Sequence, residues 1–195
     1  MDTTLKIAIV DENPIRAAIL QDGLREAGFT QVVHIAETNN LLARIHAVDP
    51  EVILIDLENP NRDVLEQMFQ VSRIVRRPIA MFVDQSDRDT IAAAMEAGVS
   101  AYIVDGLKQE RVRAILDMTI SRFSVFDRLR SELEETKSAL KERKVIEKAK
   151  GILMKTRGLD EPAAYALLRQ TAMSKGKRIA DVAESLISTY DLLRD

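Results

Sequence analysis

The chain has 195 residues and no cysteine, which excludes disulfide bonds and thiolate metal sites. No apolar run approaches the roughly 20 residues of a membrane span, and the N-terminal residues lack the features of a signal peptide, so we expect a cytoplasmic protein. The net charge of -3 is unevenly spread: Arg143–Asp195 holds 11 Lys and Arg against 7 Asp and Glu, whereas the preceding residues hold 17 against 24. The basic C-terminal part favours polyanion binding, with a solvated basic face as the alternative.

Short apolar runs alternate with helical patterns in the first part of the chain. Strands are expected at 5–10, 31–35, 51–55, 78–83 and 101–104, and helices at about 15–27, 38–47, 62–75 and 86–97. This alternation is typical of an α/β fold in which helices cover both faces of a parallel sheet.

Acidic residues follow two of these strands. Asp11 and Glu12 come directly after the first strand, and Asp56 comes after the third. The carboxyl ends of parallel strands meet at one edge of a sheet, so the three carboxylates are expected to converge there. Carboxylate oxygens suit Mg²⁺, and a carboxylate beside such an ion can accept a phosphoryl group. The alternative is that these acids only face water.

These residues resemble the receiver domains of response regulators. Asp11 and Glu12 match the acidic pair of that family, Asp56 matches its phosphoacceptor, and Pro60 and Tyr102 stand where the family pattern places them. The resemblance implies a flavodoxin-like (βα)5 domain over residues 1–122. It also implies an Mg²⁺ site made by Asp11, Glu12 and Asp56, with no other cofactor required.

The resemblance fails at two positions that respond to phosphorylation in that family. Receivers usually carry Thr or Ser at the end of the fourth strand and Lys after the fifth, where this chain has Val83 and Asp105. The hydroxyl and the ammonium group are therefore lost, and Asp105 adds like charge to an acidic pocket. We expect a receiver that acts mainly as a docking surface for a protein partner, with phosphorylation of Asp56 left open.

A long helix is expected to follow the receiver. No Gly or Pro occurs from Leu107 to Lys150, which permits 44 helical residues. Apolar side chains then recur at alternating spacings of three and four, as in a short coiled coil; the positions are Phe126, Leu129, Leu133, Thr136 and Leu140. We interpret 123–142 as a helical linker. It pairs with a second copy through 126–140, folds back on the chain, or stays exposed.

The last segment, 143–195, predicts a small domain of three short helices around one core. The first helix is expected to end at Gly158, and the second to run from an Asp160 cap to Gly176. Apolar residues from Ile179 onward recur in helical register and predict the third.

Basic residues line one face of the first of these helices. Lys144, Lys148, Gly151 and Lys155 lie at i, i+4, i+7 and i+11. A mid-helix glycine costs about 1 kcal/mol relative to alanine, so Gly151 indicates close approach of a sugar-phosphate backbone or of another helix. Further candidate RNA contacts are Arg157, Tyr165, Arg169, Lys175, Lys177 and Arg178.

The same segment resembles the ANTAR domain of transcription antiterminators. The run AKGILM and the groups Ala164-Tyr165 and Asp181-Val182-Ala183 carry the match. The resemblance implies a protein that binds paired stem-loops in leader transcripts. We do not expect an enzyme, because the sequence offers no nucleophile-base pair, no Gly-rich phosphate loop and no metal cluster beyond the receiver acids. A receiver without its Thr and Lys, fused to ANTAR, is similar to NasT-type regulators of nitrate and nitrite assimilation, which implies a nitrate- or nitrite-sensing partner of the NasS kind. The alternative is a phosphorylation-activated regulator whose output domain binds DNA or protein.

Overall fold

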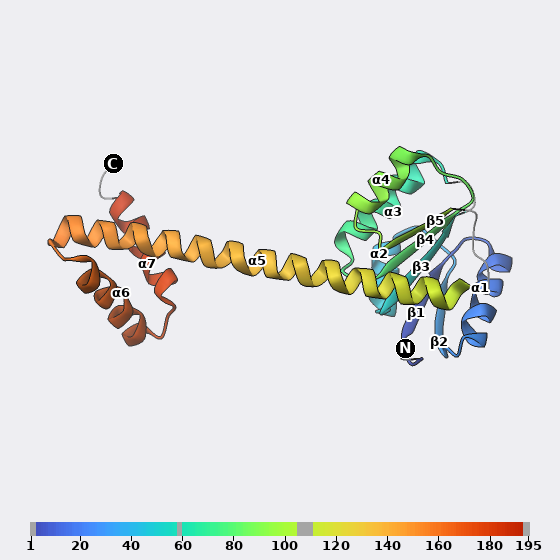
Figure 1. Cartoon of the computed structure of the whole chain (residues 1–195), viewed down its shortest axis with the longest axis horizontal. Coiled ribbons are helices and arrows are strands. Elements are labelled where there is room, and N and C mark those ends of the chain that lie inside the picture. Colours follow the sequence, from blue (N-terminus) through green and yellow to red (C-terminus); the bar gives the residue numbers. More distant parts are fainter. Residues whose placement is uncertain (1–2, 58–59, 105–110, 193–195) are drawn as a thin grey trace. The chain divides into compact units, whose positions relative to one another are not determined.

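The chain forms two compact units in a computed structural model that describes residues 3–57, 60–104 and 111–192 (Figure 1). One unit runs from Met1 to Asp127 and the other from Arg128 to Asp195. The division falls inside the segment that the sequence predicts as a helical linker. Within the described ranges, none of the helices combines the length and apolarity needed to cross a membrane.

The first unit is built on a parallel sheet with strand order β2-β1-β3-β4-β5. The strands are β1 (Lys6–Val10), β2 (Gln31–Ile35), β3 (Val52–Leu57), β4 (Ile79–Val83) and β5 (Ala101–Val104). The helices between them are α1 (Pro14–Glu26), α2 (Leu41–Val48), α3 (Arg62–Ile74) and α4 (Arg88–Glu96). This order is the flavodoxin-like one, so the α/β prediction is confirmed.

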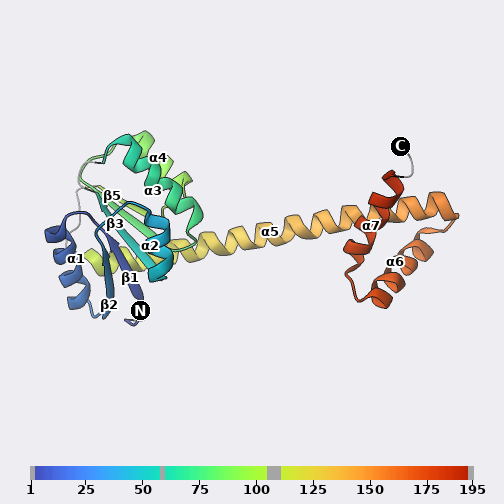
Figure 2. The ribbon, with the colours of Figure 1, turned by 180° about the vertical axis from the view of Figure 1, so that it is seen from behind.

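Helices cover both faces of the sheet (Figures 1 and 2), and each face has its own hydrophobic core. Helix α1 and the start of α5 (Val112–Arg157) cover one face with buried residues that include Leu20, Leu24 and Leu116. Helices α2, α3 and α4 cover the other face. Because both faces are covered, β4 is buried along its whole length and reads as an uninterrupted apolar run.

Asparagine caps fix the helices that follow β1 and β3. The Asn13 side chain accepts hydrogen bonds from the backbone N–H groups of Ile15 and Arg16, and the Asn61 side chain accepts one from Val64. Each cap satisfies N–H groups that the first helical turn leaves unpaired. Helices α1 and α3 therefore begin beside the carboxyl edge of the sheet, where the acidic residues lie.

Helix α5 is continuous over 46 residues and passes through Gly151. The first of the three helices predicted for 143–195 is the last part of α5, and it ends at Arg157, directly before Gly158, as predicted. Ala149, Ile152 and Leu153, on either side of the glycine, are buried. Their burial offsets the cost of about 1 kcal/mol that a helical glycine brings.

The second unit packs the end of α5 against α6 (Glu161–Lys175) and α7 (Ile179–Leu192). Asp160 caps α6 by accepting a hydrogen bond from the Ala163 N–H at 2.9 Å, and Gly176 ends α6 in the left-handed conformation at φ 60°. The predicted limits of α6 are thus found. The core is made largely of small side chains, which let the helices approach closely; its buried members are Ala149, Leu153, Ala164, Leu168 and Ala183.

Substitution Leu168→Ala should destabilise this small core by about 2–5 kcal/mol, because it leaves a cavity at a residue only 3 % exposed. Met173→Ala on the same helix is the control: Met173 is 73 % exposed, and its loss should change the free energy of unfolding by less than about 0.5 kcal/mol. Urea unfolding followed at the NMR amide signals of α7 measures both. Equal losses in the two variants would contradict the packing described.

Candidate functional site: an acidic receiver pocket and a basic helical face

Two buried carboxylates meet at the carboxyl edge of the sheet. Asp11 directly follows β1, and Asp56 lies in β3; they are 1 % and 8 % exposed. Both border a cavity of about 600 Å³ that Asn13, Thr38 and Asn61 also line. The predicted convergence of the first and third strands on one crevice is therefore found for these two residues.

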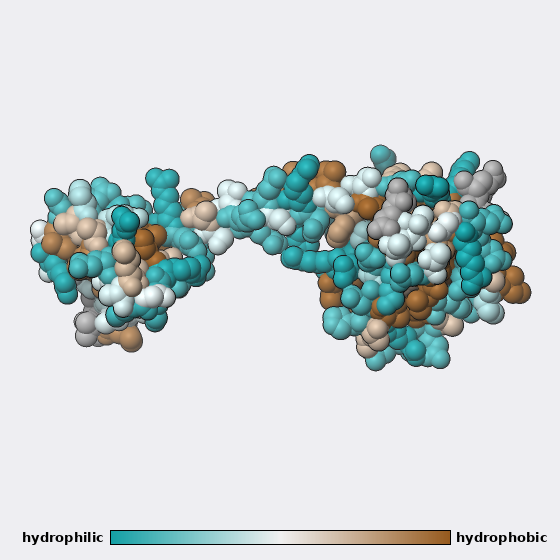
Figure 3. Space-filling view, turned by 90° about the horizontal axis from the view of Figure 1, so that it is seen from below, coloured by the Kyte–Doolittle hydropathy of each residue, from teal (hydrophilic) through white to brown (hydrophobic). Residues whose placement is uncertain are grey.

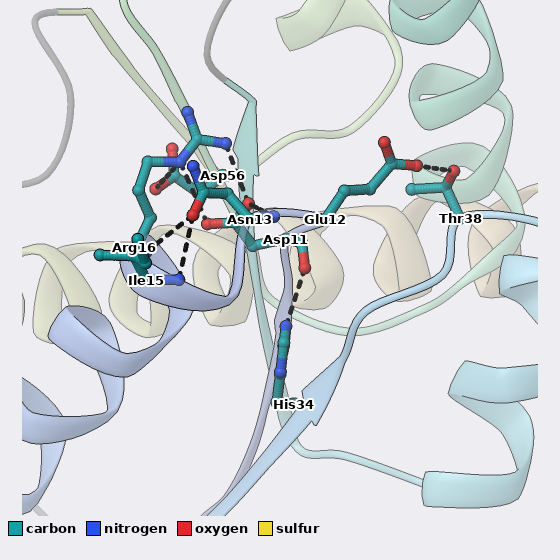
Figure 4. A network of polar contacts seen from close by, with 8 residues as sticks. All are labelled: Asp11, Glu12, Asn13, Ile15, Arg16, His34, Thr38 and Asp56. Carbon is teal, nitrogen blue, oxygen red and sulfur yellow. Dashed lines mark hydrogen bonds and ion pairs between the residues drawn. The ribbon is translucent and has the colours of Figure 1, made fainter.

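A guanidinium group occupies the space between the two carboxylates (Figure 4). Arg16, in the first turn of α1, donates from Nη2 to Asp11 Oδ1 at 2.9 Å and from Nε to Asp11 Oδ2 at 3.3 Å. The same Nε lies 3.8 Å from Asp56 Oδ2. Arg16 was not among the site residues predicted from the sequence. Its signal was an arginine five residues after a strand-end aspartate, where the first helical turn brings the side chain back to the strand end.

The third predicted ligand, Glu12, points elsewhere. Its Oε1 accepts a hydrogen bond from Thr38 Oγ1 at 2.5 Å, on the side away from Asp56 in Figure 4. Asp11 Oδ1 also accepts the Asn13 N–H at 2.8 Å. Over the described ranges, no group of three or more His, Cys, Asp or Glu side chains is placed to hold a metal ion. In this arrangement the acidic residues do not fit Mg²⁺.

Of the two positions predicted to have lost the residue that responds to a phosphoryl group, Val83 lies within the described structure. Val83 ends β4 fully buried and pairs with Leu57, the residue after Asp56 in β3. An apolar side chain therefore stands next to the strand that carries Asp56, where a hydroxyl would be needed to donate to a phosphoryl oxygen. Asp105 lies outside the described residues.

The basic face of α5 is exposed at all four predicted positions, which are Lys144, Lys148, Gly151 and Lys155. A Cβ atom added at Gly151 would meet nothing within 4 Å. Close packing of another helix of this chain is therefore not the reason for the glycine. The fold itself would accept alanine at this position.

Two of the predicted RNA contacts are engaged in ion pairs within the unit. Lys148 Nζ lies 3.2 Å from Asp191 Oδ2 of α7, and Arg178 Nη1 lies 2.9 Å from Glu142 Oε1 of α5. Arg178 also pairs with Asp181 at 2.8 Å. The hydrogen bond to Asp181 raises the pKa of Arg178, and the same bond lowers the pKa of Asp181. These exposed pairs are each weak, and they join α7 to α5.

Most of the other cations predicted to contact RNA are not held by an acidic side chain; we call these the uncommitted cations. Five of them form no ion pair with any described residue: Lys144, Lys155, Arg157, Arg169 and Lys175. Lys177 acts at longer range on Asp181, and Tyr165 is 42 % exposed. The uncommitted cations are the ones that can neutralise phosphates without first breaking a contact of the folded chain.

One basic residue of the AKGILM run has a structural role. Lys150 is 7 % exposed, and its Nζ lies 2.8 Å from Glu147 Oε1 and 2.6 Å from Glu161 Oε1. The hydrogen bond to Glu147, and to a smaller extent the one to Glu161, raises the pKa of Lys150. Lys150 thus ties α5 to the first turn of α6 and faces away from solvent.

Comparison with known proteins defines the class. Residues 7–117 match the response regulator receiver domain, and residues 134–187 match the ANTAR domain. The chain therefore belongs to the response regulator receiver family and carries a C-terminal ANTAR domain. This is a regulatory family rather than a typically enzymatic one.

The chain is similar to several individual proteins of known name or structure. The transcriptional regulatory protein PdtaR of Mycobacterium tuberculosis is 25 % identical over 190 residues, which cover 97 % of this chain and 93 % of PdtaR. The nitrate regulatory protein of Klebsiella oxytoca is 35 % identical over 82 residues, covering 42 % of this chain and 21 % of that protein. The CheY-like receiver of Methanospirillum hungatei JF-1 superposes with a TM-score of 0.54 at 17 % identity, over 62 % of this chain and 97 % of that one, which shows the fold alone.

Substitution Gly151→Ala should raise the free energy of unfolding of the second unit by about 0.5–1 kcal/mol, because nothing opposes the added methyl group. Gly158→Ala is the matched control. Gly158 also has nothing within 4 Å, but its φ of +66° strains any residue with a Cβ, so this change should destabilise. Thermal or urea unfolding measures both. A destabilised Gly151→Ala variant would show that the face is not open.

Proposed function

We propose that this protein regulates transcription by antitermination, binding stem-loops in leader RNA through its ANTAR domain under the control of a partner that docks on its receiver. One observation carries the RNA interface: α5 leaves Gly151 open in the middle of an exposed basic face, although the fold does not require a glycine there. A helix whose side-chain layer is interrupted in this way lets a sugar-phosphate backbone approach its axis.

The charge of this face supports RNA as the ligand. Lys144 and Lys155 lie on either side of Gly151 on the same face of α5 and form no ion pair with the described residues. The whole chain has only 3 Tyr, 5 Phe and no Trp, which argues against a platform of stacked bases on a sheet. Backbone contacts from lysine and arginine then supply most of the affinity, and that affinity falls steeply with salt.

The receiver supports control by a protein rather than by a phosphoryl group. Val83 offers no hydroxyl, and Asp11 and Asp56 are already paired with Arg16. The similarity of part of the chain to the Klebsiella nitrate regulatory protein supports nitrate or nitrite as the signal. The partner in this proposal is a nitrate- or nitrite-sensing protein of the NasS kind.

We further propose that the seam of α5 forms a homodimer. Its apolar side chains are half or more exposed in the single chain: Phe126, Leu129, Leu133 and Leu140 at 60, 52, 53 and 53 %. Figure 3 shows apolar patches among hydrophilic atoms along the exposed middle of α5. Pairing two copies along this seam would bring two ANTAR domains to two stem-loops, and bivalency would add avidity without new contacts.

A second candidate function is a phosphorylation-activated regulator with a DNA- or protein-binding output. Its support is Asp56, which keeps a carboxylate at the carboxyl end of β3, bordering the cavity. Against it stands the composition of α7, which holds Asp181, Glu184 and Asp191 but no Lys or Arg, so this helix offers DNA no cationic face.

The RNA interface is tested by binding of a two-hairpin leader RNA, without a phosphodonor, across a range of salt concentrations. Lys155→Ala should weaken binding and reduce the salt slope by about 1, because one phosphate contact is lost. Arg113→Ala, which removes an exposed cation from the receiver part of α5, is the control and should leave both quantities unchanged.

Two results would count against the RNA proposal. Binding that begins only after a phosphodonor is added would favour the second candidate. Binding to duplex DNA that is as tight as binding to the hairpin RNA, or tighter, would show that the ligand is DNA and not RNA.

The dimer is tested by measuring molar mass in sedimentation equilibrium. The wild type should have the mass of two chains and Leu133→Lys that of one, because a charge replaces an apolar side chain in the seam. Ser131→Lys adds the same charge outside the seam and should stay dimeric. If the wild type has the mass of one chain at all accessible concentrations, the proposal that two copies pair along the seam is wrong.

A further inference from the structure

The acidic pocket of the receiver carries its own cation. Asp11 and Asp56 are the carboxylates that the fold brings together, and their side chains are 0 % and 10 % exposed. Arg16 meets both of them while remaining 26 % exposed. A guanidinium is charged at every accessible pH, and its planar fork matches a carboxylate in the two-bond arrangement seen with Asp11.

Local structure holds Arg16 in this position. Asn13 donates its N–H to Asp11 Oδ1 at 2.8 Å and accepts the Arg16 N–H on its side chain at 3.4 Å. The aspartate, the helix cap and the guanidinium are therefore linked within a single turn of chain. Little conformational freedom remains to be lost when the ion pair forms, since α1 already points the side chain at the strand end.

A divalent cation would need the same oxygen atoms. Mg²⁺ requires ligands at about 2.0–2.1 Å in an octahedral arrangement, whereas both oxygens of Asp11 already accept hydrogen bonds from Arg16. Glu12, the third ligand predicted from the sequence, is bonded to Thr38. Binding of Mg²⁺ would thus have to displace a covalently attached competitor whose local concentration does not depend on solution conditions.

We propose that Arg16 is a built-in replacement for the divalent cation, so that the receiver pocket is held together without a metal ion. Arg16 supplies one positive charge against the two negative charges of Asp11 and Asp56, so part of their repulsion is offset by the chain itself. The positive charge of Arg16 is already engaged by Asp11 and Asp56, so it is not free to stabilise an incoming phosphoryl group as a bound metal ion would. The receiver then keeps one conformation that a protein partner can recognise at any Mg²⁺ concentration. This inference does not depend on the RNA function proposed above.

The test compares Mg²⁺ binding by the full chain in three forms: wild type, Arg16→Gln and Arg25→Gln. Arg25 lies on the same helix and makes an exposed ion pair with Asp22, so Arg25→Gln matches the change in charge without reaching the pocket. Isothermal titration with Mg²⁺, and broadening of NMR signals of β1 and β3 by Mn²⁺, report binding. The wild type and Arg25→Gln should bind neither ion at the pocket.

Arg16→Gln should gain a site for both ions with at least about tenfold higher affinity, because loss of a charge-assisted pair frees the carboxylates. Adding Asp56→Asn to Arg16→Gln should remove the gained site. A wild type that binds as tightly as Arg16→Gln, or a folded Arg16→Gln that gains no site, overturns the proposal. If Arg16→Gln does not fold, the wild type alone still tests the proposal. Broadening of the Asp11 and Asp56 signals by Mn²⁺ in the wild type would show that the proposal is wrong.

Discussion

The continuity of helix α5 is the constraint on which this structure depends. Helix α5 contributes Val112 and Leu116 to one receiver core, and Ala149 and Leu153 to the core of the second unit. Each unit therefore needs a segment of the same helix to complete its packing. The helix ends only where Gly158 adopts a positive φ, which residues with a Cβ adopt at a cost. A single element thus covalently joins the domain that receives a signal to the domain that acts on it.

The receiver shows how a fold can keep its shape while its chemistry changes. The sheet order, the two cores and the capped helices place Asp11 and Asp56 at one edge. What they meet there is an arginine of the same chain, and the neighbouring strand ends in a buried valine. Buried carboxylates are stable only when their charge is balanced. Here a guanidinium of the same chain offsets part of that charge.

In the second unit, the cations divide into two groups by their partners. Lys148, Lys150 and Arg178 pair with acids of the same unit and connect its three helical segments. Others, such as Lys155 and Arg169, have no such partner among the described residues and remain available. A small core rich in alanine buries little apolar area, so ion pairs between helices help to set their arrangement, while the uncommitted cations can serve a polyanion.

The sequence by itself determined the alternation of strands and helices and the caps at Asp160 and Gly176, because these depend on periodicity and on local backbone preference. The family of each part was indicated by resemblance at particular motif residues. Only the tertiary structure decided which charges meet. It turned Glu12 toward Thr38, placed Arg16 between two aspartates from different strands, and left Gly151 open. The contacts of Glu12 with Thr38 and of Arg16 with Asp56 join residues far apart in the chain, and no local pattern specifies them. They follow from the packing of helices on the sheet and on one another.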